Sequence, residues 1–561
     1  MPVTRVQLSR LPGGRVLVTE QAGHREVGLD DLPAYVAERE GREAPRWVWD
    51  DTGRWYPELL AAGVRVSRCQ DLRLVHHLLR RAPAADQRLL AGEQSERWDR
   101  LGPSVASEVG LFAVEDTTEQ LRADLEDARQ LRTVAESPES TRLGLLVAAE
   151  SAGALVAAEM TYAGMPWRND VHEALLRDVL GPRPPRGARP QKLEQLADRV
   201  REALATPRLN PDSNPELLAA LRRAGLEVPD TRAHTLRALR HPAVEPLLRY
   251  RQAAHLFQTN GWAWSEEWTS GGRFRPTYQP AGSVTGRWSS NGGGALSFPA
   301  LVRPAAIADD GWALVVTDVS QLEPRVLAGM SGDRALAHAA RGADLYQGMV
   351  DDGAVAGRND AKLGLLGAMY GATSGESGRM VAELTRRYPQ AFALLERAAH
   401  EGERGGTVRT LLGRGSPSVD DAWADAEADV EREASRRRAY GRFTRNFVVQ
   451  GTGAEWALCW IADLRNRLWA LGAHGPLQAR PHLVLFLHDE VVVHTPAHLA
   501  EQVVAAAREA AATASALVFR ELSIDFPLSA SVVRSYAEAG KSSPAAETDE
   551  EPVLPTQSVE G

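Results

Sequence analysis

The chain has 561 residues and a formal net charge of −9, which allows several domains and does not exclude nucleic acid, because phosphate binding depends on local clusters of basic groups. Its two cysteines, Cys69 and Cys459, exclude a disulfide scaffold and fit a reducing compartment. We find no apolar run near the length of a membrane span and no signal sequence, so we expect a soluble, cytoplasmic protein.

Residues 1–142 combine short strand patterns with helical stretches. The strand-like pieces cover residues 15–19, 47–49 and 64–66, and a helix is predicted over Leu72–Arg81. Residues 114–142 are acidic and polar, which predicts a linker with a helix over 118–132. We therefore expect a small α/β domain followed by a connecting segment.

A long apolar helix is predicted from Thr141 to Met160. Residues 180–215 are rich in Pro and Arg, which is typical of exposed loops, and helical periodicity resumes over 216–257. Strands, turns and helices then alternate from Phe274 to Tyr536. Residues 541–561 form an acidic tail that we expect to be disordered.

Two aspartates follow or interrupt apolar strands. Asp318 comes directly after the apolar run 312–317, and His488-Asp489-Glu490 separates the runs 483–487 and 491–494. That connection lacks the Asn-Gly or Asp-Gly of a solvent-facing hairpin turn, and carboxylates beside a half-buried sheet are costly unless a cation or donors compensate them. The pattern suggests a two-metal phosphoryl-transfer site. An ordinary charged turn remains the alternative for this segment alone.

A basic helix lies between the two aspartates in the sequence. Arg358, Lys362, Leu366 and Tyr370 recur every four residues, so they share one stripe of a helix that ends at Gly371. Cations followed by an apolar and an aromatic side chain suit a nucleoside triphosphate. Only 3 of the 65 Lys and Arg residues are lysine, which singles out Lys362. An amphipathic helix with a solvated basic edge is the alternative.

Together these residues resemble the family A DNA polymerases, the group of bacterial DNA polymerase I. The first polymerase motif of this family is matched by residues 318–325. The second is matched by Arg358, Lys362, Tyr370 and Gly371, and the third by His488-Asp489-Glu490. Residues 285–290, Thr-Gly-Arg-Trp-Ser-Ser, resemble the family's Thr-Gly-Arg-Leu-Ser-Ser element, and Arg442, Asn446 and Gln450 resemble its template-binding and primer-binding segment. The resemblance covers about residues 143–540 in the correct order.

The resemblance implies an α+β, multi-domain, right-hand polymerase fold. We expect an N-terminal α/β, exonuclease-like (RNase H-like) domain and linker at 1–142, and thumb and entry helices at 143–260. The palm is expected at 261–335 and 441–540, with the fingers at 336–440 and the tail at 541–561. The expected partners are primer–template DNA and dNTPs, bound by a monomer associated with a bacterial nucleoid and not with a membrane.

The resemblance also implies a role for each matched residue. Two Mg²⁺ ions would be held by Asp318, Val319 and Asp489, one activating the primer 3′ hydroxyl and the other binding the triphosphate. Arg358 and Lys362 would neutralise phosphate charge, with Lys362 as proton donor, Glu490 as a secondary acid and His488 positioning the primer end. Glu323 matches the steric gate against a ribose 2′ hydroxyl. The remaining expected contacts are Gln321, Leu366 and Tyr370 to the nucleotide, and Arg287, Arg442, Asn446, Gln450, Tyr370 and Gly371 to DNA.

Several positions depart from the family pattern. Leu366 replaces a Phe or Tyr, which predicts weaker nucleotide affinity and altered dideoxynucleotide discrimination. Val319 replaces a tyrosine, and residues 291–298 lack the family's Asn-Leu-Gln-Asn. Proofreading needs four acidic ligands that begin with Asp-x-Glu on the first strand. The early strand 16–20 has no such pair, and Glu115-Asp116 comes too late, so the N-terminal domain is expected to be a degenerate scaffold.

Three functions are compatible with these observations. The leading one is a DNA polymerase for repair or accessory replication whose proofreading activity is lost. The second is a bifunctional enzyme with an active 3′–5′ exonuclease. The third is a non-catalytic DNA-binding protein built on a polymerase fold, which the two aspartates and Lys362 disfavour.

Overall fold

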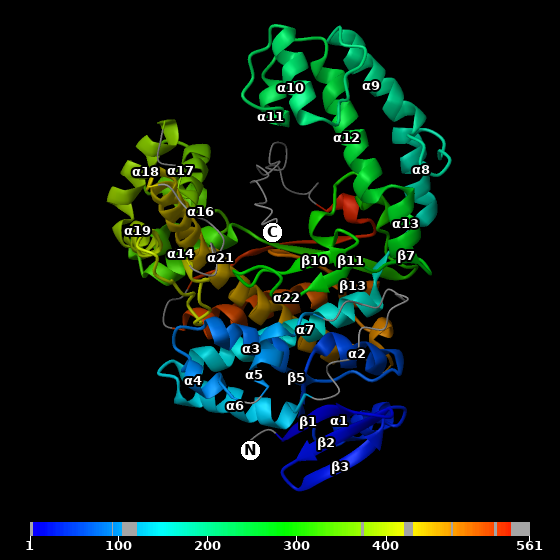
Figure 1. Ribbon diagram of the computed structural model, residues 1–561, viewed down its shortest axis with the longest axis vertical. Coiled ribbons are helices and arrows are strands. Elements are labelled where there is room, and N and C mark those ends of the chain that lie inside the picture. Colours follow the sequence, from blue (N-terminus) through cyan, green and yellow to red (C-terminus); the bar gives the residue numbers. More distant parts are fainter. Residues whose placement is uncertain are drawn as a thin grey trace.

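The computed structural model describes residues 4–92, 94–103, 121–371, 375–419, 430–472, 475–520 and 524–539. An N-terminal unit lies at one end of the long axis, a central four-stranded sheet with long helices lies in the middle, and two helical lobes stand on the far side of that sheet (Figure 1). The acidic tail at 541–561 and the Glu115-Asp116 pair fall outside the described residues.

The N-terminal unit is a five-stranded mixed sheet with helices. Its strand order is β3-β2-β1-β4-β5, with β1 antiparallel to β2 and parallel to β4. Its buried core includes three tryptophans, Trp47, Trp49 and Trp55. The elements are β1 (Arg5–Leu11), β2 (Arg15–Glu20), β3 (Gly23–Gly28), α1 (Leu32–Arg42), β4 (Arg46–Trp49), α2 (Thr52–Ala61), β5 (Arg68–Asp71), α3 (Leu72–Arg81), α4 (Gln87–Leu90), α5 (Ser95–Arg100) and α6 (Ala123–Glu136).

The predicted strands at 15–19 and 47–49 and the helix at 72–81 are confirmed. The strand predicted at 64–66 is wrong, because Val64 and Val66 are buried in a loop and the strand begins at Arg68. In the described part of 114–142 the predicted helix is present, shifted to Ala123–Glu136, but the prediction that this segment is a linker is wrong. There α6 packs into the unit through Asp127, which accepts hydrogen bonds from Arg5 Nε at 3.0 Å and Gln7 Nε2 at 3.1 Å.

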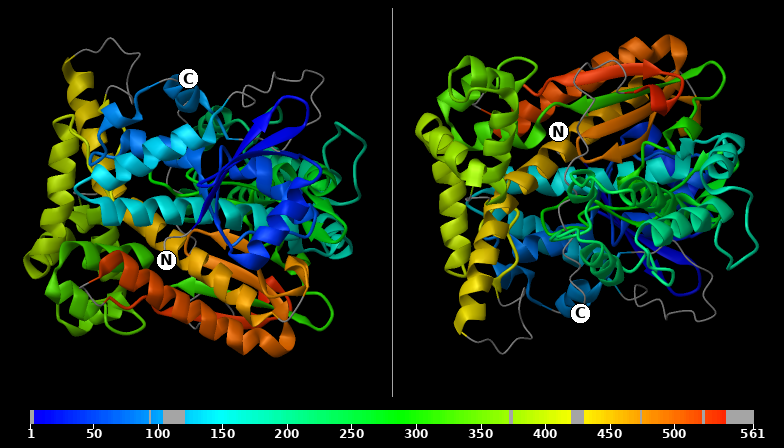
Figure 2. Two further views of the ribbon diagram at one scale, coloured as in Figure 1. Left: turned by 90° about the horizontal axis from the view of Figure 1, so that it is seen from below. Right: turned by 90° about the horizontal axis from the view of Figure 1, so that it is seen from above.

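The long apolar helix α7 (Ser140–Ala163) joins the N-terminal unit to the centre of the molecule. By length and composition it could span a membrane, which corrects the expectation that no segment could, but 72% of its most apolar window is buried inside the protein. Leu155 belongs to the N-terminal core and Leu146 to the central core. Figure 2 shows α7 in cyan beside the yellow-to-orange α21 (Val430–Leu471), with which it is in contact. The predicted boundary at 142/143 therefore falls inside a helix.

A buried ion pair ties α7 to α21 and to the N-terminal unit. Arg465 on α21 donates to Glu159 on α7 through Nε at 2.8 Å and through a terminal nitrogen at 2.6 Å. The same guanidinium donates to the Ser67 carbonyl at 3.0 Å, and the Tyr56 hydroxyl donates to Glu159 at 2.5 Å. Since a buried charge is tolerated only when it is paired and hydrogen-bonded, this contact requires both units to stay docked.

The central sheet has the order β12-β13-β11-β14 and is antiparallel throughout. The strands β11, β12 and β13 are mostly apolar runs in which consecutive residues are buried, so both faces of this part of the sheet are covered. Asp318 lies in β11, and Asp489 lies in the turn between β12 and β13. The elements are β11 (Trp312–Val319), β12 (His482–Leu487), β13 (Glu490–Pro496), α22 (Ala500–Phe519) and β14 (Leu528–Val533).

Two helical lobes flank the sheet. One is drawn in teal and green at the upper right of Figure 1, and the other in yellow-green at the left. The first contains α8 (Asn169–Leu180), α9 (Gln191–Ala203), α10 (Asn214–Arg223), α11 (Ala233–Arg237), α12 (Val244–Asn260) and α13 (Trp262–Trp268). The second contains α14 (Leu322–Ser331), α15 (Arg334–Ala339), α16 (Leu345–Asp351), α17 (Arg358–Tyr370), α18 (Gly375–Arg387) and α19 (Pro389–Glu403). Because α21 is one continuous helix, the predicted boundary at 440/441 lies within it.

Short elements complete the centre. They include two small sheets, β6-β8-β7 and β9-β10, and several 3₁₀ turns. Their bounds are β6 (Met165–Pro166), β7 (Thr269–Ser270), β8 (Arg273–Phe274), β9 (Thr277–Gln279), β10 (Ser289–Gly292), η2 (Ala295–Ser297), η3 (Arg303–Ala305), η4 (Leu477–Ala479), η5 (Ala497–Leu499) and η6 (Tyr536–Glu538).

Candidate active site

Asp318 and Asp489 lie at the same end of two neighbouring strands. In the register of β11 and β13, Asp318 is opposite Glu490, and the Val319 N–H donates to the Asp489 carbonyl at 3.0 Å. Residues that face each other in an antiparallel pair have Cα atoms about 5 Å apart. Both aspartates are half-buried. The fold therefore brings together two carboxylates that are 171 residues apart in the sequence.

The turn between β12 and β13 has an unusual backbone. His488 has φ of +60°, a left-handed conformation that costs a non-glycine residue about 1 kcal/mol, and the Asp489 N–H donates to the Leu487 carbonyl at 2.6 Å. Burial, together with the nearby Arg287, lowers the pKa of His488 to about 4. The imidazole is neutral at pH 7, so it can accept or donate one hydrogen bond without adding charge beside Arg287.

Glu490 differs from the two aspartates in its surroundings. Its carboxylate accepts a hydrogen bond from the Tyr536 hydroxyl on η6. Burial raises the pKa of Tyr536 well above its ordinary value, and the Glu490 charge raises it further, so the phenol stays protonated as a donor. The structure therefore gives Glu490 a partner at the C-terminal end of the described chain, in keeping with a secondary role.

The helix α17 carries the predicted basic stripe. It covers Arg358–Tyr370 and ends at Gly371, whose φ of +79° is left-handed. Lys362 and Leu366 are half-buried on its open face. A Cβ at Gly364 would lie 2.7 Å from Leu384 Cδ1 of α18, so close packing against α18 explains this glycine.

Both ends of α17 are linked to the segment that follows Asp318. At one end, the Tyr370 hydroxyl donates to Glu323 Oε2 at 2.9 Å. At the other, Arg358 donates through Nε to Asp344 at 2.7 Å, and the same carboxylate accepts from Gln321 Nε2 at 2.9 Å. The helix is thus held alongside the end of β11 by two separate sets of side chains.

Glu323 is the centre of one of these sets. Glu323 accepts hydrogen bonds from both Tyr370 and Arg287, and its side chain is 13% exposed. Burial and the Glu323 charge raise the pKa of Tyr370 well above its ordinary value, while a hydrogen bond with Gln450 of α21 opposes the rise. The predicted steric gate therefore has a fixed orientation, set by residues of three different segments.

The predicted DNA contacts on α21 lie four residues apart, at Arg442, Asn446 and Gln450, and so share one face of the helix. Arg442 is exposed, and its Cγ lies 2.9 Å from the position that a Cβ on Gly371 would occupy. This close approach explains the glycine and places α21 next to the C-terminal end of α17. Asn446 Oδ1 is buried without a hydrogen-bond partner among the described residues.

Sequence reasoning missed two groups of residues at the site. Asp344 was not predicted, although its place before Leu345-Tyr346-Gln347 is the position of a helix N-cap. The second group, around Glu455, joins α21, α7 and the loop before Arg414. Thr410 donates to Glu455, the Leu412 N–H donates to Glu455 at 3.0 Å, and Arg414 donates to Glu150. No local pattern could have paired these residues, because each contact joins distant segments.

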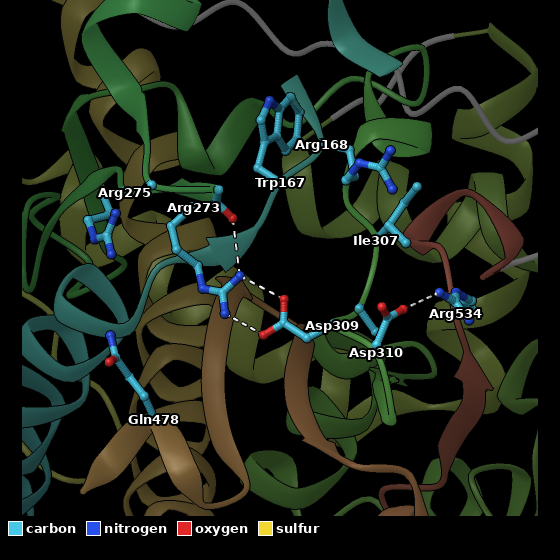
Figure 3. A pocket seen from close by; sticks show the side chains of 12 residues that line it. Trp167, Arg168, Arg273, Arg275, Ile307, Asp309, Asp310, Gln478 and Arg534 are labelled. Atoms are coloured by element: carbon cyan, nitrogen blue, oxygen red, sulfur yellow. Dashed lines mark hydrogen bonds and ion pairs between the residues drawn. The ribbon is translucent and has the colours of Figure 1, made fainter. Parts of the chain in front are cut away.

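A separate cavity of about 550 Å³ lies at the opposite end of β11, near Asp309 and Asp310 (Figure 3). Six strand residues, 312–317, separate this end from Asp318, a distance of about 20 Å. Arg273 points at Asp309 and binds it with both terminal nitrogens, and Arg534 binds Asp310 at 2.8 Å. Because it lies at the other end of β11, this cavity is not part of the site around Asp318.

Comparison with known proteins agrees with this geometry. The family model described as DNA polymerase family A matches residues 189–538, well over half of the chain. The chain belongs to DNA polymerase family A. It is 32% identical over 315 residues to the thermostable DNA polymerase I of Thermus thermophilus, covering 50% of this chain and 35% of that protein. It is also 28% identical over 353 residues to DNA polymerase I of Chloroflexus aurantiacus, covering 54% and 35%.

A solved structure supports the fold over nearly the whole chain. The POL domain of Pol1 from M. smegmatis, in complex with DNA primer-template and dNTP, has a TM-score of 0.69 and 20% sequence identity, with 96% of each chain covered. The predicted polymerase-type α+β fold is therefore confirmed. The matched region spans about a third of the length of the curated relatives.

Proposed function

We propose that this protein is a template-directed DNA polymerase that adds dNTPs to a primer 3′ hydroxyl by two-metal phosphoryl transfer, in DNA repair or accessory replication. The observation that carries this proposal is the placement of α17. Its basic stripe is fixed at both ends to residues 321–323, directly after Asp318, while Asp489 is hydrogen-bonded to that strand. Carboxylates for metal ions and cations for phosphates thus converge from three segments.

The proposal assigns a role in DNA synthesis to the central sheet and to each helical lobe. The central sheet with α21 and α22 is the palm, α14–α19 are the fingers, and α8–α12 are the thumb. Primer–template DNA would lie over the face of the palm that the two lobes flank (Figure 1). The exposed Arg442 of α21 would contact it. The family relationship and the fold of the M. smegmatis POL domain support this assignment.

The residues present fit Mg²⁺. Asp318 and Asp489 offer hard oxygen ligands at adjacent strand ends, and among the described residues no group of three or more His, Cys, Asp or Glu could hold a metal alone. Two carboxylates suffice, because Mg²⁺ is usually held by one or two carboxylates together with substrate phosphates. When bound, Mg²⁺ supplies Lewis-acid activation of the attacking hydroxyl and neutralises the phosphates.

The chain's own side chains then perform the remaining steps. Arg358 and Lys362 bind the phosphates, and the Lys362 ammonium can give a proton to the departing pyrophosphate, which a guanidinium cannot readily do. Glu323, held by Tyr370 and Arg287, excludes a ribose 2′ hydroxyl by occupying its volume. Neutral His488 is placed to orient the primer terminus without repelling a cation.

A primer-extension assay tests this function. With Mg²⁺ and all four dNTPs, the wild-type protein should extend a labelled primer to the template end, and each single-dNTP reaction should follow the template sequence. Asp489→Ala should abolish extension. Asp310→Ala is the matched control, because Asp310 lies at the other end of β11 with a 97% exposed side chain and should leave extension unchanged. Failure of the wild-type protein to extend any primer would refute the proposal.

We also propose that the N-terminal unit is an exonuclease-like scaffold that has lost proofreading. The first strand, β1, has no acidic residue, and the acids after β4 and β5 are engaged in the fold. Asp51 accepts from Gly53 N–H at 2.9 Å and from Arg73 Nε at 2.9 Å, while Asp71 accepts from Thr52 N–H at 2.7 Å and Leu74 N–H at 2.9 Å. These carboxylates cap helices. In the same assay without dNTPs the primer should stay intact, and Asp489-independent shortening would favour an active exonuclease.

A further inference from the structure

Asp344 has two oxygens with different surroundings. Its Oδ1 accepts from the Tyr346 N–H at 3.0 Å, the Gln347 N–H at 3.3 Å and Gln321 Nε2 at 2.9 Å. Its Oδ2 accepts from Arg358 Nε at 2.7 Å. Capping α16 therefore occupies one oxygen and leaves the other directed at the basic end of α17.

The carboxylate is held rigidly where it meets Arg358. Backbone donors fix it from its own helix, and Gln321 fixes it from the segment after Asp318, while Gln321 Oε1 accepts from the Leu345 N–H at 2.8 Å. Burial raises the pKa of Asp344, but hydrogen bonds from Arg358 and the Gln347 N–H outweigh it and hold the pKa below its usual value. Asp344 is therefore ionised near neutral pH and remains a fixed acceptor.

Arg358 is a long side chain that is otherwise half-exposed, with 36% of its side-chain surface open. Its guanidinium carbon lies 5.7 Å from the centre of the ring of Tyr346, the second residue of α16. The ion pair with Asp344 uses Nε, so this contact holds the stem of the guanidinium fork, the group that recognises phosphates. Fixing such a side chain before a ligand arrives lowers the entropy lost on binding.

Asp333, in the same lobe, is an aspartate that caps a helix and accepts hydrogen bonds from backbone groups. Asp333 caps α15 through Oδ1, which accepts from the Ala335 and Leu336 N–H groups, and its Oδ2 accepts from the Gln390 N–H at 3.0 Å. Both of its oxygens are used by the backbone. Asp344 differs because its second oxygen binds a side chain that the polymerase function requires.

We propose that Asp344 is a positioning residue for nucleotide binding: with Gln321 as its support, it orients Arg358 toward the triphosphate of the incoming nucleotide. The inference rests on the proposed function, since it assigns a task to Arg358 in that reaction. On this proposal Gln321 helps to hold Arg358 in place through its hydrogen bond to Asp344, in addition to any contact of its own with the nucleotide.

Asp344→Asn tests the proposal, because asparagine caps a helix about as well as aspartate while removing the charge that holds Arg358. The KM for dNTP should rise by about threefold to tenfold, because the Arg358 side chain is then no longer held in place before the nucleotide binds. The kcat should change by less than about twofold. In an Arg358→Ala background the same substitution should have no further effect. Asp333→Asn is the matched control and should leave KM unchanged. Thermal unfolding of the Asp344→Asn and Asp333→Asn variants checks that each is folded.

A second measurement separates this proposal from the function on which it rests. Equilibrium binding of a dNTP with Mg²⁺ to the full-length protein should weaken by the same factor in Asp344→Asn. If the wild-type protein makes no DNA yet this loss of affinity is seen, the polymerase proposal fails and the positioning role stands. If synthesis is normal and neither affinity nor KM changes, or if the effects of the two substitutions simply add, the positioning role is wrong. Absence of both binding and synthesis overturns both.

Discussion

The Val319 N–H donates a hydrogen bond of 3.0 Å to the Asp489 carbonyl, so the main chain itself joins the two acidic segments. The position of each aspartate is therefore set by the sheet and not by its side chain. We predict that Asp318→Asn and Asp489→Asn each abolish synthesis, by a factor of about 10³ or more, because an amide is a poor ligand for Mg²⁺. Their melting temperatures should stay within about 2 °C of wild type, because asparagine has nearly the same shape as aspartate and the main chain fixes both positions. If the variants lose activity because they unfold, the prediction that these carboxylates bind metal ions loses its support.

Glu323 should control the choice of sugar by its volume. In Glu323→Ala the space next to Tyr370 opens, and discrimination against ribonucleotides should fall by about tenfold to a hundredfold. Glu323→Gln keeps the volume and should retain most of the discrimination. Single-nucleotide incorporation with paired dNTP and rNTP measures both. An alanine variant that still rejects ribonucleotides would remove Glu323 from the role of steric gate.

Leu366 gives the open face of α17 an aliphatic contact where the family has an aromatic one. An aromatic ring adds about 0.5–1.5 kcal/mol of stacking, so Leu366→Phe should lower the KM for dNTP by about twofold to tenfold. Dideoxynucleotide incorporation should change with it. Leu366 is half-buried and lies one turn from Lys362 on the same helix face. A KM equal to that of the wild type would show that this side chain does not contact the nucleotide.

The buried pair between Arg465 and Glu159 should matter for stability. Glu159→Gln removes one partner and leaves the other charge buried, which costs about 3–5 kcal/mol. Burial raises the pKa of Glu159, but the charges of Arg465 and Arg65 outweigh it and hold the pKa below its ordinary value. A lowered pKa means that this stabilisation is present above the unfolded pKa and is lost as the pH falls.

Thermal and denaturant unfolding of Glu159→Gln would measure this loss. Glu96→Gln provides the control, because the Glu96–Arg100 pair is about 80% exposed on both sides and its removal should change little. Equal stability of the two variants would mean that the N-terminal unit does not depend on this contact.

Glu455 predicts a pH effect of the opposite sign. Burial raises its pKa from 4.5 to about 7, so between these values the folded protein keeps a proton that the unfolded chain releases. Stability therefore falls as the pH rises through this range and levels off above the folded pKa. Glu455→Gln cannot ionise, so its stability relative to wild type should increase by about 1–3 kcal/mol between about pH 5 and about pH 8. A difference that is constant with pH would show that Glu455 does not ionise in this range.

Much of the site could be predicted from the sequence because its signals are local. The spacing of Arg358, Lys362, Leu366 and Tyr370 requires one helical face, and the structure confirms that helix from end to end. Apolar runs ending at Asp318 and around Asp489 likewise predicted strands that the structure contains. Errors arose where local composition misleads. The acidic stretch that becomes α6 resembled a linker because two partners of its buried acids are distant in the sequence: Arg5 pairs with Asp127, and His76 contacts Glu126, which also pairs with Arg129 of the same helix.

By itself, then, the sequence determined the family, the helix that carries the cations and the strands that carry the carboxylates, since periodicity and residue order record these directly. Only the tertiary structure decided which groups meet: Asp344 with Arg358, Glu323 with Tyr370 and Arg287, and Glu159 with Arg465. The physical reason is that such pairs join segments far apart along the chain. Their formation depends on how the helices and the sheet pack, and no neighbouring residue in the sequence records it.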